Sequence, residues 1–252
     1  MRIEQLLSDS AARLGHKAAI VTGRAAHSYA ELDRKSDRLA AALAGRGIKR
    51  GDHIATFLDT GFATVVAAFG VLKAGATLCP ADPATGSDAL AGFLNQSRAC
   101  GIVTEARLAS RAATAMREAP AVKLVVLAGG DRSAATGNCI SFEDAVRRIE
   151  GAVPFPAGGD ADAAITRGIV AADGTIGLEI FSHAETIATL PATTPGDDAA
   201  AAPRTSIASH QGIRHLISAI AAGATLVLES TAAGRAPFVA TPGFGDMRLA
   251  LA

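Results

Sequence analysis

Hydrophobic and polar residues follow each other in the first half of the chain in a pattern that switches between strand-like and helix-like stretches. Short, β-rich apolar runs indicate buried strands, and the longer amphipathic stretches between them indicate helices. Strands are expected near 53–58, 77–79, 101–104 and 123–127, with helices over about 61–74, 86–97 and 106–117. Strands and helices that alternate at this spacing predict a parallel sheet with helical crossovers.

The residues before these strands predict a hairpin and an amphipathic helix. In 18–28 a β-branched pair is followed at once by Gly23, which is typical of two short strands around a turn. Ser28 and Glu31 have the spacing of a capping box, in which the hydroxyl accepts a bond from the Glu31 amide and the carboxylate reaches back. A helix is therefore expected to begin there and to end near 45–47.

A stretch rich in glycine and proline, 129–162, separates this part from a second unit. That unit has predicted strands near 163–170 and 174–181, a helix beginning at Ser182, a helix over 211–222 and a strand over 224–229. The fold class is thus α/β, with a Rossmann-like parallel sheet layer over 1–130, a connection over 131–162 and a second, partial α/β lobe over 163–252.

The composition favours an extra buried face, and it argues against nucleic acid and anionic membranes as partners. Charged residues make up 19% of the chain and hydrophobic residues 49%, against about 25% charged in an average domain, so an oligomer contact is expected. Lysine plus arginine and aspartate plus glutamate both number 24, which argues against nucleic acid or an anionic membrane as a partner. No run has the length of a membrane span and the N-terminus lacks a signal-peptide core, which predicts a cytoplasmic protein.

The cysteines and histidines do not form a recognisable metal or disulfide pattern. Cys79, Cys100 and Cys139 are odd in number, widely spaced and free of any CxxC motif, whereas disulfide frameworks and zinc sites need paired cysteines. Buried thiols are the simpler interpretation. His210 and His215 are five positions apart, off the face that a helical zinc pair needs.

Eight short motifs, each present once, are spread over nearly the whole chain: Ser28–Asp33, Arg38–Leu43, Gly47–Asp52, Phe69–Ala76, Pro80–Pro83, Ala161–Ile165, Phe181–His183 and Ala221–Leu228. Their order and spacing resemble those of acyl-CoA synthetases and their adenylate-forming relatives, and imply the fold of the N-terminal region of those enzymes. The early motifs build the scaffold in that family and leave catalysis to later segments. Membership therefore does not establish activity.

The resemblance also implies a phosphate-binding loop, and this sequence departs from it. Family members place a loop rich in Ser, Thr and Gly, followed by a lysine, between Ala161–Ile165 and Ser182–His183. Small residues there let backbone amides surround phosphate, and the ammonium group offsets its charge. Counting back from Ser182, Gly174 falls on a loop glycine and Thr175 supplies a hydroxyl, but Gly177 occupies the lysine position. Gly174 and Thr175 are thus the remainder of a degenerate cofactor-binding loop.

Charge in this segment also opposes a nucleotide. Asp173 and Glu179 are acidic where a polyphosphate would lie, and each close carboxylate–phosphate pair would be repulsive by about 1 kcal/mol or more. Arg167 is the only cation within reach, and no lysine follows Lys123. We therefore expect an ordinary hairpin with a two-residue turn at Asp173–Gly174.

Two histidines near these motifs have competing interpretations. The resemblance implies that a histidine before Ala221–Leu228 lies near an acyl pocket, and His210 matches it with a shifted register. His210 is therefore the candidate substrate-binding residue, and a helix-capping or loop histidine is the alternative. Ser182 and His183 would point in different directions, and with Glu185 they predict a helix N-cap rather than a nucleophile–base pair. No catalytic residue or metal ligand is assigned.

These features predict a pseudoenzyme, a non-catalytic acyl-CoA synthetase-like protein that acts through association or residual ligand binding and needs no cofactor. The chain ends at Ala252, near where later family motifs would begin, so we expect a truncated member with exposed apolar faces. A homodimer or a protein partner would cover them, through the helix 213–222 and the segment 236–244. The alternative is half of a split AMP-forming acyl-CoA ligase, completed by another chain and using ATP, Mg²⁺ and CoA. A relic without selected activity is a third possibility.

Overall fold

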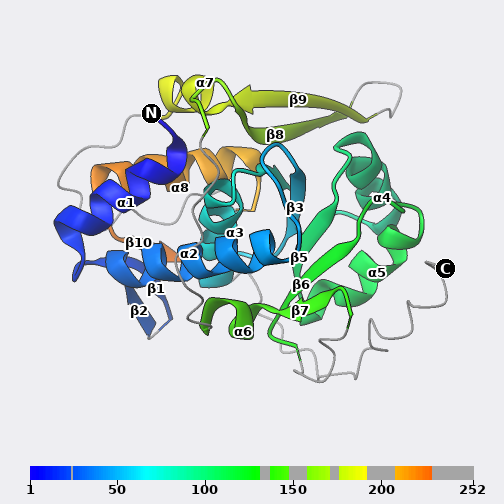
Figure 1. The fold of residues 1–252 in the computed structure, drawn as a ribbon, viewed down its shortest axis with the longest axis horizontal. Coiled ribbons are helices and arrows are strands. Elements are labelled where there is room, and N and C mark those ends of the chain that lie inside the picture. The colour runs from blue at the N-terminus through cyan, green and yellow to red at the C-terminus, as the bar shows by residue number, and fades with distance from the viewer. Residues whose placement is uncertain (24, 131–136, 148–157, 171–175, 192–207, 229–252) are drawn as a thin grey trace.

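A computed structural model describes residues 1–23, 25–130, 137–147, 158–170, 176–191 and 208–228, drawn as a ribbon in Figure 1. The helices are α1 (Ile3–Leu14), α2 (Tyr29–Gly45), α3 (Phe62–Lys73), α4 (Ser87–Gln96), the 3-10 turn η1 (Ala106–Leu108), α5 (Ala109–Arg117), α6 (Phe142–Arg147), α7 (His183–Ala188) and α8 (His210–Ala222). The strands are β1 (Ala18–Thr22), β2 (Ala25–Ser28), β3 (His53–Phe57), β4 (Thr77–Pro80), β5 (Gly101–Glu105), β6 (Leu124–Ala128), β7 (Cys139–Ser141), β8 (Ala163–Val170), β9 (Ile176–Ser182) and β10 (Leu226–Leu228).

The centre of the fold is a seven-stranded sheet in the order β7-β6-β5-β3-β4-β8-β9. Neighbours from β7 to β8 pair in parallel, and β9 runs antiparallel to β8. The predicted α/β class and parallel sheet are confirmed. The strands expected in the first half coincide with β3, β4, β5 and β6 to within one residue at each end.

Alternate residues of each central strand enter two different hydrophobic layers, because successive side chains of a strand point to opposite faces. Ile54 of β3 belongs to a layer with α1, α2, α3, α6 and α8, whereas its neighbour Ala55 belongs to a layer with α4 and α5. Figure 1 shows these two groups of helices on different sides of the sheet. Helices on both faces are typical of a parallel sheet, whose strands are buried on both sides.

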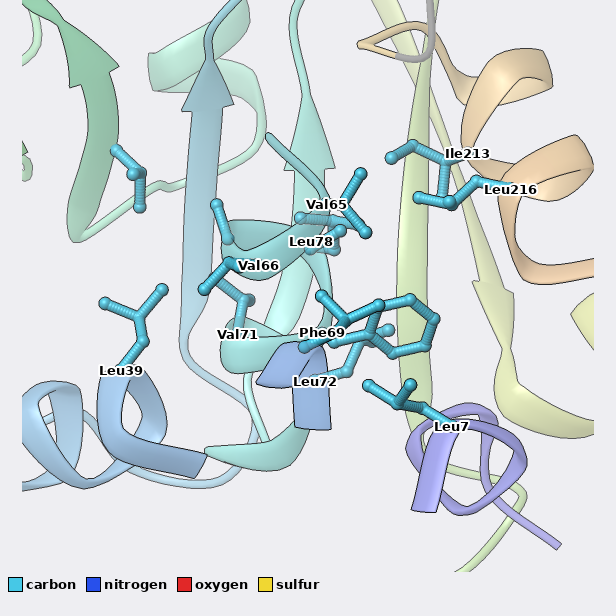
Figure 2. Packing of buried hydrophobic residues seen from close by; sticks show 14 of the residues in the cluster. Leu7, Leu39, Val65, Val66, Phe69, Val71, Leu72, Leu78, Ile213 and Leu216 are labelled. Atoms are coloured by element: carbon cyan, nitrogen blue, oxygen red, sulfur yellow. The ribbon is translucent and has the colours of Figure 1, made fainter. Parts of the chain in front are cut away.

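Helix α3 is apolar on nearly every side because it lies between the sheet and an outer layer of helices. Figure 2 shows Phe69 of α3 together with Leu7 of α1, Leu39 of α2 and Leu216 of α8, which belong to the same hydrophobic cluster. Gly70 lets α2 approach closely, since a Cβ atom at this position would lie 2.8–3.0 Å from the Leu39 side chain. The glycine of the early motif therefore serves packing.

A buried lysine fixes the end of α3 against α2. Lys73 is 4% exposed, and its Nζ donates to Asp33 Oδ1 at 2.6 Å and to Asp37 Oδ1 at 2.5 Å. Its ammonium group also donates to the Asp33 carbonyl oxygen at 3.1 Å. Three acceptors satisfy the three ammonium protons, so the charge is tolerated in the interior.

The start of α2 is close to its prediction. Ser28 Oγ accepts a bond from the Glu31 amide at 3.2 Å, as the spacing indicated. The Glu31 carboxylate does not reach back to complete a capping box, and contacts Lys35 Nζ at 2.8 Å and His27 Nδ1 at 3.2 Å instead. Side-chain partners one turn away are the stronger competitors for a carboxylate.

The chain after residue 162 is built into the same structure as the first half. Leu78 of β4 pairs with Ile165 of β8, so the hairpin that the sequence placed in a second lobe extends the sheet of the first. β10 pairs with β1 in a three-stranded sheet of order β10-β1-β2, and the Tyr29 hydroxyl donates to the Ala224 carbonyl at 2.6 Å. The boundaries at 130 and 162 stay predictions about sequence units, because strands from both sides share sheets.

Helix α8 does not offer the apolar surface that we expected from 213–222 for self-association. Its side chains Ile213, Leu216, Ile217 and Ile220 are at most 1% exposed and lie in the layer that also holds α1. Ser10 of α1 donates to the Ile220 carbonyl at 2.9 Å. This expectation was wrong because α1 was not predicted and covers the helix. The segment 236–244 lies outside the described residues, and a homodimer stays a prediction.

The cysteines are free thiols, as the spacing predicted. Cys79 and Cys139 are buried and Cys100 is half-buried. Burial raises the pKa of Cys79 to about 12 and that of Cys139 to about 11, so neither is a thiolate at neutral pH. Across the described ranges, no three His, Cys, Asp or Glu side chains gather where they could hold a metal ion. No helix in those ranges has the length and apolarity to cross a membrane.

Candidate functional site

A cavity of about 590 Å³ lies where the end of β4, helix α4, strand β8 and the first turn of α8 meet. Its volume is in the range of small-molecule pockets. The lining combines small and apolar groups on the α4 side with polar groups on the β8 and α8 side: Pro80, Ala81, Asp82, Thr85, Ala89, Phe93, Arg167, Gly168, Ser209, His210, Gln211 and Arg214. His210, the residue predicted to bind substrate, is part of this wall.

The first turn of α8 faces the cavity. Ser209 is the N-cap, and its hydroxyl accepts a hydrogen bond from the Gly212 amide at 3.1 Å. The amides of the first helical turn have no acceptor within the helix and carry part of the positive end of the helix dipole. His210 and Arg214 are one turn apart, so their side chains share the face that lines the cavity.

The imidazole of His210 is neutral at physiological pH. Burial is the main cause that lowers its pKa, and the positive charges of Arg167 and Arg214 lower it further. Its ring lies 4.8 Å from the Phe181 ring, centroid to centroid, at a tilt of 37°. Nδ1 is buried and has no hydrogen-bond partner among the described residues. The ring also forms a hydrogen bond with the backbone of Thr166, so Nδ1 is the acceptor nitrogen of the neutral imidazole.

The two arginines of the cavity differ in their partners. Arg167 of β8 forms an ion pair with Glu179, which faces it across the β8–β9 ladder, and its guanidinium lies 5.6 Å from the Phe181 ring centroid. Nε of Arg214 is buried and has no hydrogen-bond partner in the described part of the chain. The positive charge of Arg167 is thus matched by Glu179, whereas Nε of Arg214 has no partner in the described ranges.

Among the described residues, Asp82 is the one carboxylate that lines the cavity. Its Oδ1 accepts a hydrogen bond from the Ala84 amide at 2.8 Å, and its carbonyl accepts one from the Thr85 amide at 2.9 Å. Asp82 is therefore used to shape the turn between β4 and α4, a role that Asp commonly has in turns.

The predicted phosphate loop is described only at its two flanks. β8 and β9 form the expected antiparallel hairpin, with Val170 opposite Ile176 as the last pair before the loop. Gly174 and Thr175, the predicted cofactor-binding residues, lie outside the described residues, as does the expected turn at Asp173–Gly174. Gly177, at the lysine position, lies in β9 opposite Ile169.

The Ser182–His183 pair is a helix cap, as predicted. Ser182 Oγ accepts a bond from the Glu185 amide at 3.1 Å, and the Glu185 carboxylate accepts one from the Ser182 amide at 2.8 Å. His183 points away from this cap into the core, where Nδ1 accepts a bond from the Ile3 amide at 3.1 Å. The pair therefore has no nucleophile–base geometry.

Sequence reasoning identified His210 but not its neighbour Arg214, and it used Asp82 only as part of a motif. The signal for Arg214 was present, because it follows His210 by four positions at a predicted helix start. No feature of the sequence indicated that Asp82 and the α4 residues line the same cavity as His210, because only the three-dimensional fold brings them close to α8.

Relatives among known proteins agree with this fold. Isonitrile lipopeptide synthase of Mycobacterium tuberculosis is 39% identical over 111 residues, which is 44% of this chain and 4% of the relative. The salicyl-AMP ligase / salicyl-S-ArCP synthetase of the same organism is 38% identical over 106 residues, or 40% of this chain and 19% of the relative. The chain thus spans a small part of the curated relatives that it matches.

Solved structures match over most of the chain. MbtA of Mycobacterium smegmatis, in its apo form, superposes with a TM-score of 0.79 at 28% identity, covering 90% of this chain and 44% of its own. The anthranilate CoA ligase AuaEII, in complex with anthranoyl-AMP, superposes with a TM-score of 0.82 at 16% identity over 92% of this chain and 46% of its own. The second likeness supports the fold alone.

The profile of the AMP-binding enzyme family matches residues 7–165, which is more than half of the chain. This match contains the α2, α3 and β4 motifs on which the resemblance was based, and it ends in β8. The chain belongs to the AMP-binding enzyme family.

Proposed function

We propose that this chain is a non-catalytic member of its family that binds a small organic acid and does not use ATP. The observation that carries the proposal is the ion pair between Arg167 and Glu179 at the base of the hairpin. Arg167 is the only lysine or arginine between 149 and 203, and a carboxylate of the facing strand already pairs with it. A polyphosphate at this hairpin would have to compete with Glu179 for the one cation that the described strands of the hairpin carry.

Two further observations support the loss of nucleotide handling. The family match ends at residue 165, immediately before the segment in which the serine, threonine and lysine positions of the loop are replaced. Gly177 stands at the lysine position and offers no charge to a γ-phosphate. The scaffold of the family is thus retained, while the chemistry of its phosphate loop is not.

The ligand part of the proposal rests on the cavity. It is built from described residues of β4, α4, β8 and α8 and has the size of a small-molecule site. One relative is named as a salicyl-AMP ligase, and salicylate is an aromatic acid. An aromatic acid would place its ring against Phe93 and Ala89. We also propose that the protein self-associates and that it is located in the cytoplasm.

The alternative is that the chain is one part of a split AMP-forming ligase. This chain covers 44% of the MbtA chain, and in this alternative another polypeptide would supply the remaining motifs. In that case ATP, Mg²⁺ and CoA would be the cofactors. The charge at the Arg167–Glu179 pair is harder to reconcile with it.

ATP–pyrophosphate exchange with a panel of aromatic and aliphatic acids tests the proposal. We expect no exchange above the protein-free background for the chain alone. Exchange that requires one of the acids would contradict the proposal and favour a ligase, and a Glu179→Gln variant shows whether release of Arg167 is enough to restore it.

A further inference from the structure

β9 is an edge strand of the seven-stranded sheet, and Figure 1 shows it at the outer rim of the fold. Among the described residues the other edge strands, β2, β7 and β10, have four, three and three residues, whereas β9 has seven. Edge strands are usually kept short or carry lysine or proline, because their free N–H and C=O groups can pair with another chain. β9 is long and contains neither residue.

The side chains of β9 form two rows, one on each face of the sheet. Leu178 packs against the hydrophobic layer that holds α4, and Ile180 lies two positions further, on the same face. Ile180 is 50% exposed, which among the large hydrophobic side chains of the described residues is exceeded only by Met1. Glu179 and Phe181 belong to the other face, where Phe181 contacts the ring of His210. An exposed apolar side chain thus stands in the middle of a free edge.

A second copy of β9 fits this edge when the pairing is centred on Ile180. A symmetric dimer uses the same surface of both subunits, so two β9 strands would run antiparallel. In this register Ile180 lies opposite Ile180 of the partner subunit, and Glu179 lies opposite the partner's Phe181. A centre at Glu179 would instead place two carboxylates directly opposite each other, which destabilises an antiparallel pair.

The charges on the other face of β9 also suit a pairing of two copies. Glu179 forms an ion pair with Arg167 of its own chain, so the edge brings no net charge from this row. The Arg167 guanidinium also lies 5.6 Å from the Phe181 ring centroid. When Glu179 lies beside the partner's Phe181, it therefore approaches the partner's Arg167, and the row gains an attraction between the subunits.

We infer that β9 is a self-association edge through which two copies of this chain pair antiparallel, centred on Ile180, and join their seven-stranded sheets. This pairing is the strand-addition mode of recognition, in which main-chain hydrogen bonds hold the partner and side chains set the register. The inference rests on the proposed self-association and adds the surface that carries it. It is independent of ligand binding in the cavity.

Light scattering coupled to size-exclusion chromatography of the whole chain at about 100 μM tests this pairing. We expect the mass of two chains of 25.3 kDa each. Ile180→Lys should give the mass of one chain, because two ammonium groups would meet at the centre. Val227→Lys makes the same change at a 36% exposed position of the edge strand β10 and should stay dimeric. A monomeric wild type, or a dimeric Ile180→Lys, would overturn the inference.

A cysteine at the centre tests the register without adding a charge. Directly opposite residues of an antiparallel pair have Cα atoms about 4.5–5.5 Å apart, which suits a disulfide. Under mild oxidation we expect Ile180→Cys to form a disulfide-linked dimer that dithiothreitol reverses, and Val227→Cys to form none above the wild-type background. Equal cross-linking at the two positions would contradict the pairing. The non-catalytic proposal fails by a different result, acid-dependent ATP–pyrophosphate exchange.

Discussion

Protonation of the core histidine His183 should lower the stability of the fold at acidic pH. His183 is 1% exposed, and its Nδ1 accepts the Ile3 amide proton at 3.1 Å, which holds the start of α1. Nδ1 cannot accept this bond when it carries a proton. Glu4 Oε2 is 3.6 Å from the same nitrogen and would form an ion pair only with the protonated ring. The folded structure therefore selects neutral His183.

The size of the effect follows from the pKa of His183. Burial, followed by the charge of Arg2, lowers this pKa from 6.5 to about 4. Because the unfolded chain takes up the proton at the higher pH, His183 contributes its full stability above pH 6.5 and loses it as the pH falls toward 4. The whole difference corresponds to about 3 kcal/mol, and the loss between pH 7.5 and pH 5 to about 2 kcal/mol.

Urea unfolding followed by circular dichroism at pH 7.5 and pH 5 measures this loss. His183→Gln keeps an acceptor for the Ile3 amide and does not titrate, so its free energy of unfolding should fall by about 2 kcal/mol less than that of the wild type. His16→Gln changes an exposed histidine and should keep the wild-type dependence. The N-terminal amine lowers the pKa of Asp160, and Arg50 lowers that of Asp162; both carboxyls are present in wild type and variant, so their contribution cancels in the comparison. Equal losses in wild type and His183→Gln would refute the reasoning.

Two further changes test the packing of α2 against α3. Lys73→Met leaves Asp33 and Asp37 without their buried cation. These carboxylates are 23% and 45% exposed and can be hydrated. We therefore expect the free energy of unfolding in urea to fall by about 2–3 kcal/mol, somewhat below the cost of breaking a fully buried pair. Gly70→Ala should lower the stability by about 1–2 kcal/mol, despite the better helix propensity of alanine, because its Cβ would overlap Leu39.

The same kinds of substitution at less crowded positions serve as controls for these two predictions. Lys35→Met removes a half-exposed partner of Glu31 and should cost less than about 1 kcal/mol. Gly86→Ala adds a Cβ with nothing within 4 Å, so steric overlap contributes nothing there. Losses of equal size at Lys35 and Lys73, or a gain of stability in Gly70→Ala, would contradict the packing described.

Local periodicity was enough to predict the parallel sheet, because each of β3 to β6 is a compact apolar run bounded by turn residues and followed by a helical stretch. The hairpin of β8 and β9 and the caps at Ser28 and Ser182 were also local signals. The pairing of β10 with β1 joins Ile20 to Leu226, and nothing in either short strand specifies so distant a partner. Helix α1 was overlooked, since its sequence was considered only as a possible targeting segment.

The residues of the site were predictable only where the local sequence carried a signal. His210 is marked by a resemblance of local sequence; it lies in the cavity wall, and its substrate-binding role stays a prediction. Arg214 becomes notable only when the first turn of α8 is placed opposite α4 and β4. Gly174 and Thr175 lie outside the described residues, so their part in binding a cofactor stays a prediction that binding experiments have to settle.

The most direct test of the central claim is the melting temperature of the chain with 1 mM MgATP. A site with a dissociation constant of about 10 μM would stabilise the fold by about 2.7 kcal/mol at that concentration, which for a chain of this size is a rise of roughly 5–10 °C. The pairing of Arg167 with Glu179 and the absence of a lysine at position 177 predict a rise below about 1 °C. A rise of several degrees that saturates with ATP would contradict the account.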